Sequence, residues 1–204
     1  MFEIVRAAGW PIWPLLATSV VAVALIVERL LALRGSRVAP PRLLDDVLAL
    51  VQQRRAGAEA LERLERSSPL GRLLAAGLRQ RGRPRALARE ALEQAGQAVA
   101  HELSRRVGAI GTIAAIAPLM GLFGTVIGMI DIFGAYSPAA DDPARLAHGI
   151  SVALYNTGFG ILIAIPAMIF YRALRARVDD LLLELEQAAA RLLDALPLRE
   201  AAQA

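Results

Sequence analysis

The chain has 204 residues, of which 56% are hydrophobic, and its mean hydropathy is +0.46. This composition is too apolar for an ordinary soluble domain of this length and indicates several membrane spans. All 23 basic residues are arginine and no cysteine is present. Disulfides, cysteine-bound metals and lysine Schiff bases are therefore excluded.

Three windows are long and apolar enough to cross a bilayer, which takes about 20 residues. They are 12–27, 107–130 and 149–171, and the first extends to residue 33 if Glu28–Arg29 is an anchor at the interface. We interpret the first window as a retained anchor rather than a cleaved signal peptide, because its positive charge follows the apolar run. The expected fold is an all-α polytopic membrane protein with three transmembrane helices.

The arginines predict the orientation of these spans. Segment 34–106 holds 15 arginines against 8 acids, whereas the loop 134–148 has one arginine and two aspartates. The positive-inside rule then places segment 1–33 with its N-terminus outside, 34–106 in the cytoplasm, 107–171 as two spans around an external loop, and 172–204 in the cytoplasm. The isoelectric point near 10.5 is thus a signal of topology, and we expect no nucleic-acid partner.

The cytoplasmic segment has helical periodicity. Leucine and valine recur at helical spacing over 43–51, and Ser68 followed by Pro69 is a typical cap and first residue of another helix. From Pro84 onward no residue interrupts the pattern until residue 133. One helix of nearly fifty residues would be about 75 Å long, far more than a bilayer is thick.

The last helix is expected to begin at a cap on Asp142, with Pro143 at its first position. It can continue through the third span to about Leu196, and Pro197 ends it. Helices of this length project from the membrane and imply a cytoplasmic bundle.

Small residues follow one face of each of the last two spans, and they predict close approach of helices. In the second span they are Gly111, Ala114, Pro118, Gly121 and Gly128, with Thr125 interrupting the series; in the third they are Ala153, Gly160, Ala164 and Ala167, with Thr157 interrupting it. We expect neighbouring subunits to fill these stripes. The simplest role for each threonine is a hydrogen bond to its own helix, at the carbonyls of Gly121 and Ala153.

The first third of the third span contains four polar side chains but no acid; they are Ser151, Tyr155, Asn156 and Thr157. Lipid satisfies neither hydroxyls nor amides.

Three stretches resemble the ExbB/TolQ/MotA proton-channel family, and the ExbB/TolQ branch in particular. They are "ERLLALR" (28–34), "APLMGLFGTVIGMI" (117–130) and "GISVALYNTGFGILIAIPA" (149–167). The resemblance implies a homo-oligomeric ring, a pentamer, in the bacterial cytoplasmic membrane. It further implies a single-span partner of the ExbD/TolR type inside the ring, and a TonB/TolA-like protein beyond it. Proton flow between ring and partner would drive motion that energises outer-membrane transport or envelope processes, without a cofactor or a metal.

The resemblance assigns Thr125 and Thr157 to the proton pathway. Where that branch commonly has a glutamate, this chain has Val152, so the partner's aspartate is expected to carry the proton. Asn156 lies one turn from Val152 and can hydrogen-bond to a carboxylate or to water. Tyr155 is a candidate lining residue or a packing aromatic.

Asp131 at the outer end of the second span is a candidate for proton entry or a simple interfacial acid. His148 and Ser151 are not accompanied by a nucleophile elbow or an oxyanion-hole sequence, so an intramembrane protease is disfavoured and no catalytic residue is expected. Two alternatives stay open: a non-conducting membrane scaffold of the same family, and a flagellar-stator-like MotA subunit.

Overall fold

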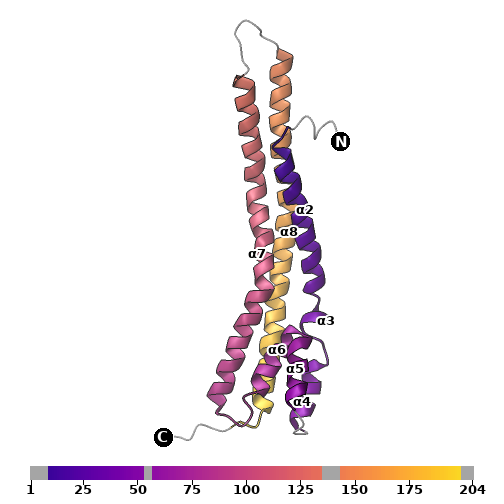
Figure 1. The fold of residues 1–204 in the computed structure, drawn as a ribbon, viewed down its shortest axis with the longest axis vertical. Helices are drawn as coiled ribbons and strands as arrows, with labels where there is room; N and C mark the ends of the chain where they lie inside the picture. The colour runs from indigo at the N-terminus through magenta and orange to yellow at the C-terminus, as the bar shows by residue number, and fades with distance from the viewer. Residues whose placement is uncertain (1–8, 53–56, 135–142, 199–204) are drawn as a thin grey trace. The chain divides into compact units, whose positions relative to one another are not determined.

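The computed structural model describes residues 9–52, 57–134 and 143–198. Every regular element within those ranges is a helix (Figure 1). The helices are α2 (Ile12–Ala32), α3 (Gly35–Val38), α4 (Leu43–Gln52), α5 (Ala58–Ser67), α6 (Pro69–Leu78), α7 (Arg85–Gly134) and α8 (Pro143–Ala195). Three of them, α2, α7 and α8, are long and apolar enough to cross a membrane, so the predicted all-α fold with three spans is confirmed.

The predicted helix ends agree with the structure wherever it describes them. At the start of α6, the Gly71 N–H donates to the Ser68 hydroxyl at 3.0 Å, and Pro69 occupies the first turn. Proline has no N–H to lose there, and its ring already fixes a helical φ. The predicted cap at Asp142 lies outside the described residues. The four-residue helix α3, in the stretch rich in proline and glycine that follows the first span, has no counterpart among the expected elements.

Two helices are much longer than a bilayer is thick. α7 has 50 residues and α8 has 53, which correspond to about 75 and 80 Å. Each continues through an internal proline, Pro118 in α7 and Pro166 in α8. As expected from the absence of other breakers, each of these two spans and its polar extension form one uninterrupted helix.

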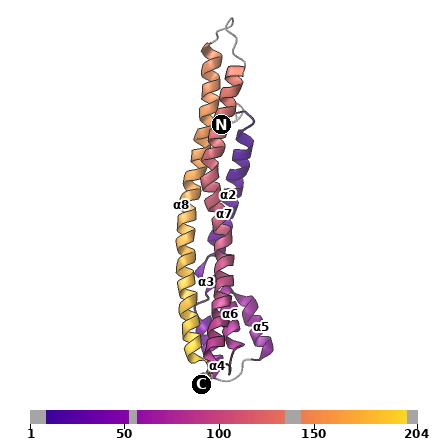
Figure 2. The ribbon, with the colours of Figure 1, turned by 90° about the vertical axis from the view of Figure 1, so that its left-hand side faces the viewer.

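The chain divides into two compact units. One contains 1–28 and 107–173, and the other contains 29–106 and 174–204. In the second unit the core is built around α6, of which seven residues are buried. A Cβ placed on Gly77 would lie 2.8 Å from the Leu192 side chain and 3.0 Å from Leu92, so α6 packs directly against both α7 and α8. α5 has no buried residue and covers the side of α6 away from α8 (Figure 2).

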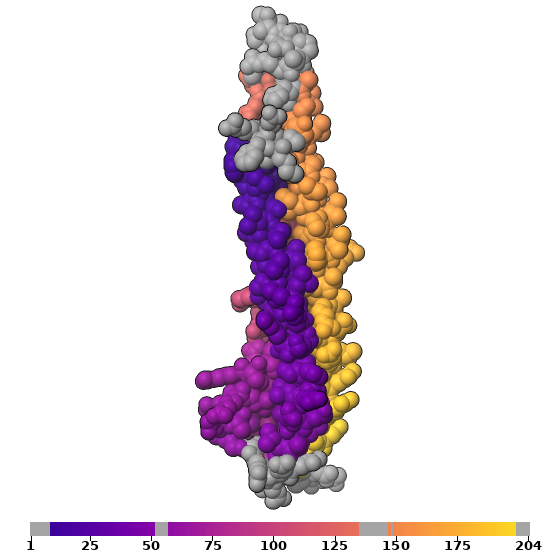
Figure 3. Space-filling view, turned by 90° about the vertical axis from the view of Figure 1, so that its right-hand side faces the viewer, coloured from indigo at the N-terminus to yellow at the C-terminus, as the bar shows by residue number. Residues whose placement is uncertain are grey.

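The first unit consists of α2 and the membrane portions of α7 and α8. α2 lies alongside the other two helices and forms much of one face of this unit (Figure 3). The Thr18 hydroxyl on α2 donates to the Pro14 carbonyl and reaches the Met120 sulfur on α7 at 3.7 Å. Large apolar side chains on the outer face of α2 are exposed, among them Val20 and Val23, as expected for a surface that faces lipid.

Candidate functional site

The centre of the first unit is a pair of threonine hydroxyls. Thr125 on α7 and Thr157 on α8 face each other, and their Oγ1 atoms are 2.5 Å apart. Both side chains are partly buried. Two residues that lie 32 positions apart in the chain therefore form one polar site between two apolar helices.

Backbone carbonyls complete this site, and they connect the two helices. The Thr125 hydroxyl is 3.3 Å from the Gly121 carbonyl oxygen of its own helix and 3.2 Å from the Ala153 carbonyl oxygen of α8. The Thr157 hydroxyl reaches across to the Gly121 carbonyl oxygen at 3.3 Å. The expected bond of Thr125 to its own helix is confirmed. For Thr157 the expectation was wrong, because at this close helix separation the carbonyl on α7 and the hydroxyl of Thr125 are in reach.

Two glycines allow the helices to come this close. A Cβ on Gly121 would lie 2.7 Å from the Asn156 carbonyl oxygen and 3.0 Å from the Thr157 Cα. A Cβ on Gly160 would lie 2.6 Å from the Ala117 carbonyl oxygen and 3.0 Å from the Gly121 Cα. Backbone packs on backbone at both positions, so any side chain would push the helices apart and lengthen the hydrogen bonds of the threonines.

Asn156 belongs to the same interface. It is 1% exposed, and its Nδ2 donates to the Val152 carbonyl at 3.3 Å. A Cβ on Gly124 would lie 2.7 Å from the Asn156 Cβ and 2.8 Å from its Cγ. The side chain of Asn156 thus occupies the space that a glycine leaves on α7. The sequence pattern alone does not identify this contact.

The rest of the two stripes also meets within one subunit. A Cβ on Gly128 would contact Ala153 at 3.3 Å, and Gly111 is covered by the ring of Tyr171. Ala164 is likewise buried, whereas Pro118 is half-buried. The expectation that neighbouring subunits fill the stripes is therefore corrected: α7 and α8 of the same chain fill each other's grooves, because both stripes lie on the faces that these helices turn toward each other.

The other candidate residues lie outside this interface. Tyr155 is 41% exposed, on a face of α8 different from that of Asn156. Asp131 is exposed near the C-terminal end of α7, and the Ser151 hydroxyl donates to the Ala147 carbonyl at 2.9 Å. The side chain of His148 lies outside the described residues. The structure thus brings Thr125, Thr157 and Asn156 together and leaves Tyr155 and Asp131 apart from them.

A shallow apolar hollow of about 600 Å³ lies on α7 beside the threonine pair. Its lining residues are Thr125, Val126, Met129, Ile130, Phe133 and Gly134. Thr125 supplies the single polar side chain of this lining. The hollow is therefore a place where an apolar segment of another molecule could contact the hydroxyl pair.

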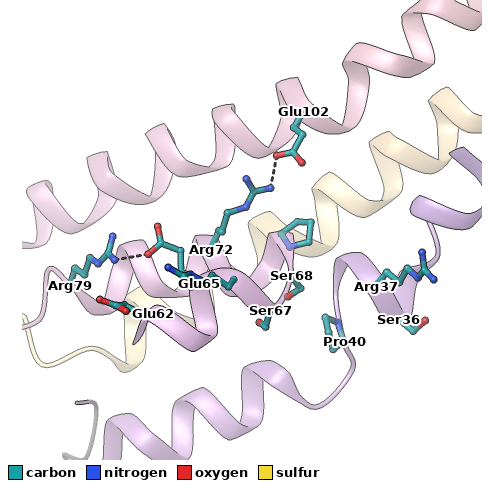
Figure 4. A pocket seen from close by; sticks show the side chains of 12 residues that line it. Ser36, Arg37, Pro40, Glu62, Glu65, Ser67, Ser68, Arg72, Arg79 and Glu102 are labelled. Atoms are coloured by element: carbon teal, nitrogen blue, oxygen red, sulfur yellow. Dashed lines mark hydrogen bonds and ion pairs between the residues drawn. The ribbon is translucent and has the colours of Figure 1, made fainter. Parts of the chain in front are cut away.

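A second, charged hollow of about 1010 Å³ lies in the other unit, between α3, α5, α6 and α7 (Figure 4). Arg72 pairs with Glu102 and Arg79 with Glu65, both at 2.5 Å. These ion pairs join α6 to α7 and α5 to α6. All four side chains are at least 38% exposed, and exposed pairs of this kind contribute little to stability. Four guanidinium groups and three carboxylates line the hollow, and two of each are paired with one another, so the hollow does not favour a ligand of either charge.

The described residues contain no group of three or more histidine, cysteine or acidic side chains that could hold a metal ion. The chemistry that this site offers is hydrogen bonding by hydroxyls, carbonyls and a buried amide within the membrane portion of the chain. That chemistry fits the movement of protons or water rather than bond cleavage.

Comparison with known proteins agrees with this chemistry. A model of the family described as the MotA/TolQ/ExbB proton channel family matches residues 65–187, which include the whole threonine site. The chain belongs to that family. It is a family of proton channels and not of enzymes, and this chain is accordingly a multi-pass inner-membrane protein.

Individual relatives belong to the ExbB and TolQ branch. An ExbB-like biopolymer transport protein of Synechocystis is 34% identical over 83% of this chain and 82% of its own length. An ExbB homologue of Methanothermobacter thermautotrophicus is 31% identical over 88% of this chain and 64% of its own. The Tol-Pal system protein TolQ of Haemophilus influenzae is 41% identical over 38% of this chain and 34% of its own. The resemblance predicted from the three motifs is therefore confirmed.

Proposed function

We propose that the chain is the ring-forming proton-channel subunit of an inner-membrane motor driven by the proton-motive force. It would work with a single-span partner of the ExbD/TolR type and energise outer-membrane transport or an envelope process through a TonB/TolA-like protein. The observation that supports this most directly is the Thr125–Thr157 hydroxyl pair, since it lies in the two spans that the family model matches.

We propose that the proton is carried by an acid from outside this chain. Over 107–130 and 150–171 the ionisable side chains are Tyr155 and Tyr171 alone. The position at which the ExbB/TolQ branch commonly has a glutamate holds Val152, which cannot titrate. We propose that an aspartate in the span of the partner takes this role at Thr125 and Thr157, with Asn156 packed behind them inside the helix pair. A carboxyl group in such an apolar setting has its pKa raised by desolvation, which brings protonation within reach at neutral pH.

Proton flux tests the proposal. Liposomes that contain the chain and its partner should conduct protons, and Thr125→Val and Thr157→Val should each reduce the flux strongly, because valine keeps the side-chain shape but removes the hydroxyl. Asn156→Leu should reduce it less. Thr112→Val is a matched control, since the Thr112 hydroxyl is exposed and bonds to the Gly108 carbonyl of its own helix.

Two outcomes of this flux measurement would change the proposed function or the proposed role of the threonines. If the wild-type complex does not conduct, the non-conducting scaffold becomes the better assignment, and Val152 is the residue that favours it. If the complex conducts and both threonine variants conduct like the Thr112→Val control, the threonines are packing residues. A flagellar-stator role would instead require that the chain generate torque on a rotor.

We also propose that the subunits form a ring of five around the partner, and here the support is the family alone. The small stripes no longer argue for it, because they pack within one subunit. Native mass spectrometry after mild extraction should detect the pentamer, and a stable lone monomer would contradict this part of the proposal.

A further inference from the structure

The hydroxyl pair contains two protons and more than two acceptors for them. Thr125 Oγ1 is within hydrogen-bonding distance of the Gly121 and Ala153 carbonyls, Thr157 Oγ1 is within reach of the Gly121 carbonyl, and the two hydroxyl oxygens are within reach of each other. A hydroxyl donates one proton and accepts with two lone pairs. The positions of these two protons therefore decide whether the pair can donate a hydrogen bond to another group.

One proton has to lie between the two hydroxyl oxygens, since at 2.5 Å two oxygens without it would face each other with their lone pairs. The second proton has a carbonyl to bond in either direction of this contact. If Thr125 donates to Thr157, then Thr157 donates to the Gly121 carbonyl. If Thr157 donates to Thr125, then Thr125 donates to the Ala153 carbonyl.

Both protons are therefore used inside the subunit in either arrangement. Of the four lone pairs on the two oxygens, one accepts the contact between them, and the other three stay open to a further donor. A carboxylate that approached the pair would have to break an internal hydrogen bond before a hydroxyl could donate to it. In a membrane interior no water replaces that bond.

We propose that the Thr125–Thr157 pair is an acceptor site that binds the protonated, neutral carboxyl group of the transmembrane partner and does not hold its carboxylate form. This inference rests on the proposed function, because it presupposes a partner with an acid in its span. The lining of the neighbouring hollow agrees with it: Thr125 is the single polar side chain among six lining residues, and an apolar surrounding favours the neutral form of an acid.

Few charged groups lie near enough to change this preference. Among the residues of the first unit whose side chains the structure describes, the ionisable ones are Glu28 on α2, Asp131 on α7, and Tyr155, Tyr171 and Arg172 on α8. Arg145 and His148 on α8 precede Thr157 by twelve and nine residues. Asp131 is six residues from Thr125, about 9 Å along the helix, and is exposed. Tyr155 has its side chain on a different face of α8 from Thr157.

This preference couples the protonation of the partner's acid to its contact with the ring. The partner's acid gains a hydrogen bond at the pair when it is protonated and loses it on deprotonation, so proton release also detaches the partner from the ring at this point. The pair thereby raises the pKa of that acid. Removing an acceptor hydroxyl should lower the pKa, and the flux, which requires the protonated form, should then reach half its maximum at a lower pH.

The test is the pH at half-maximal proton flux in liposomes that contain the chain with a co-expressed single-span partner. We expect Thr157→Val and Thr125→Val to shift this pH downward by about half to one unit, which corresponds to one ordinary hydrogen bond. Thr157→Ser, which keeps the hydroxyl, and Thr112→Val, whose hydroxyl is elsewhere, should retain the wild-type value. Valine makes the site more apolar, which alone would raise the pKa, so a downward shift cannot arise from the lost polarity.

An upward shift of this pH, or no shift, in both valine variants would overturn the inference, because the hydroxyls would then act as donors to the carboxylate or not act on the acid at all.

Infrared difference spectra of the assembled complex provide a second measurement that does not depend on flux. In the wild type and in Thr157→Ser the C=O stretch of the protonated carboxyl group should be that of a hydrogen-bonded acid, and in the valine variants it should move toward that of a free acid. An unchanged band would equally refute the acceptor site. Absence of flux in the wild type would refute the proposed function, while the infrared band still decides the inference.

Discussion

Replacement of Gly160 by alanine is expected to separate α7 from α8 and to disrupt the threonine pair. The added Cβ would lie 2.6 Å from the Ala117 carbonyl oxygen, 3.0 Å from the Gly121 Cα and 3.2 Å from the Gly121 nitrogen. All three are backbone atoms, so no change of rotamer can relieve the overlap. The helices would have to move apart by roughly 0.5–1 Å to restore ordinary van der Waals distances.

The magnitude follows from these contacts. Overpacking of this kind costs about 1–3 kcal/mol. At the same level the hydrogen bonds across the helices, which are 3.2 and 3.3 Å long, would stretch beyond their useful range, and each such bond between membrane helices is worth about 0.6 kcal/mol. We therefore expect Gly160→Ala to lose about 2–4 kcal/mol of stability.

The assay is thermal unfolding in detergent micelles, followed through the fluorescence of Trp10 and Trp13. A loss of this size should lower the midpoint by several degrees, up to about 10 °C, in a chain of this length. Gly158→Ala is the matched control: it lies on the same helix, is exposed, and a Cβ there would meet nothing within 4 Å. Its midpoint should equal or slightly exceed that of the wild type, because alanine favours a helix over glycine. If Gly160→Ala unfolds at the same temperature as Gly158→Ala, the close backbone contact and the geometry of the hydroxyl pair derived from it are wrong.

Two further predictions concern packing and topology. Gly124→Ala alone should destabilise the chain by about 1–3 kcal/mol. The double variant with Asn156→Gly should recover much of that loss, because the new methyl group then occupies the space of the amide side chain. Strictly additive effects of the two substitutions in the same unfolding assay would contradict the contact. A reporter domain fused after Leu50 should be cytoplasmic and one inserted near Ala139 external, as the arginine distribution requires, and the opposite pair of signals would reverse the direction of energy transfer.

The sequence alone predicted the long helices and most of their ends, because these depend on local chemistry, whereas the short helices α3 and α5 were not predicted. The Ser68 hydroxyl can cap the helix that follows it, and Pro69 fits the first turn of that helix. The run from Pro84 to the end of the second span contains one further proline, Pro118, and a membrane helix can continue through a proline when neighbouring groups satisfy the freed backbone carbonyl. The spacing of small residues also drew attention to the threonines: Thr125 and Thr157 interrupt two stripes of small residues, and a pattern of this kind requires a closely packed helix on the same side.

Tertiary structure alone decided which helix that is. Small residues determine how near two backbones can come, but they do not distinguish the helix of the same chain from that of a neighbour, and so the prediction of stripes filled by other subunits was wrong. For the same reason the sequence could not place Asn156, which shares a helix face with Val152 and could have turned toward a pore. The matching cavity at Gly124 on α7 places its amide inside the helix pair. The threonines can bond to each other and to carbonyls of both helices because the glycine backbones meet at Gly121 and Gly160. That contact joins residues more than thirty positions apart in the chain, so the sequence could not show it.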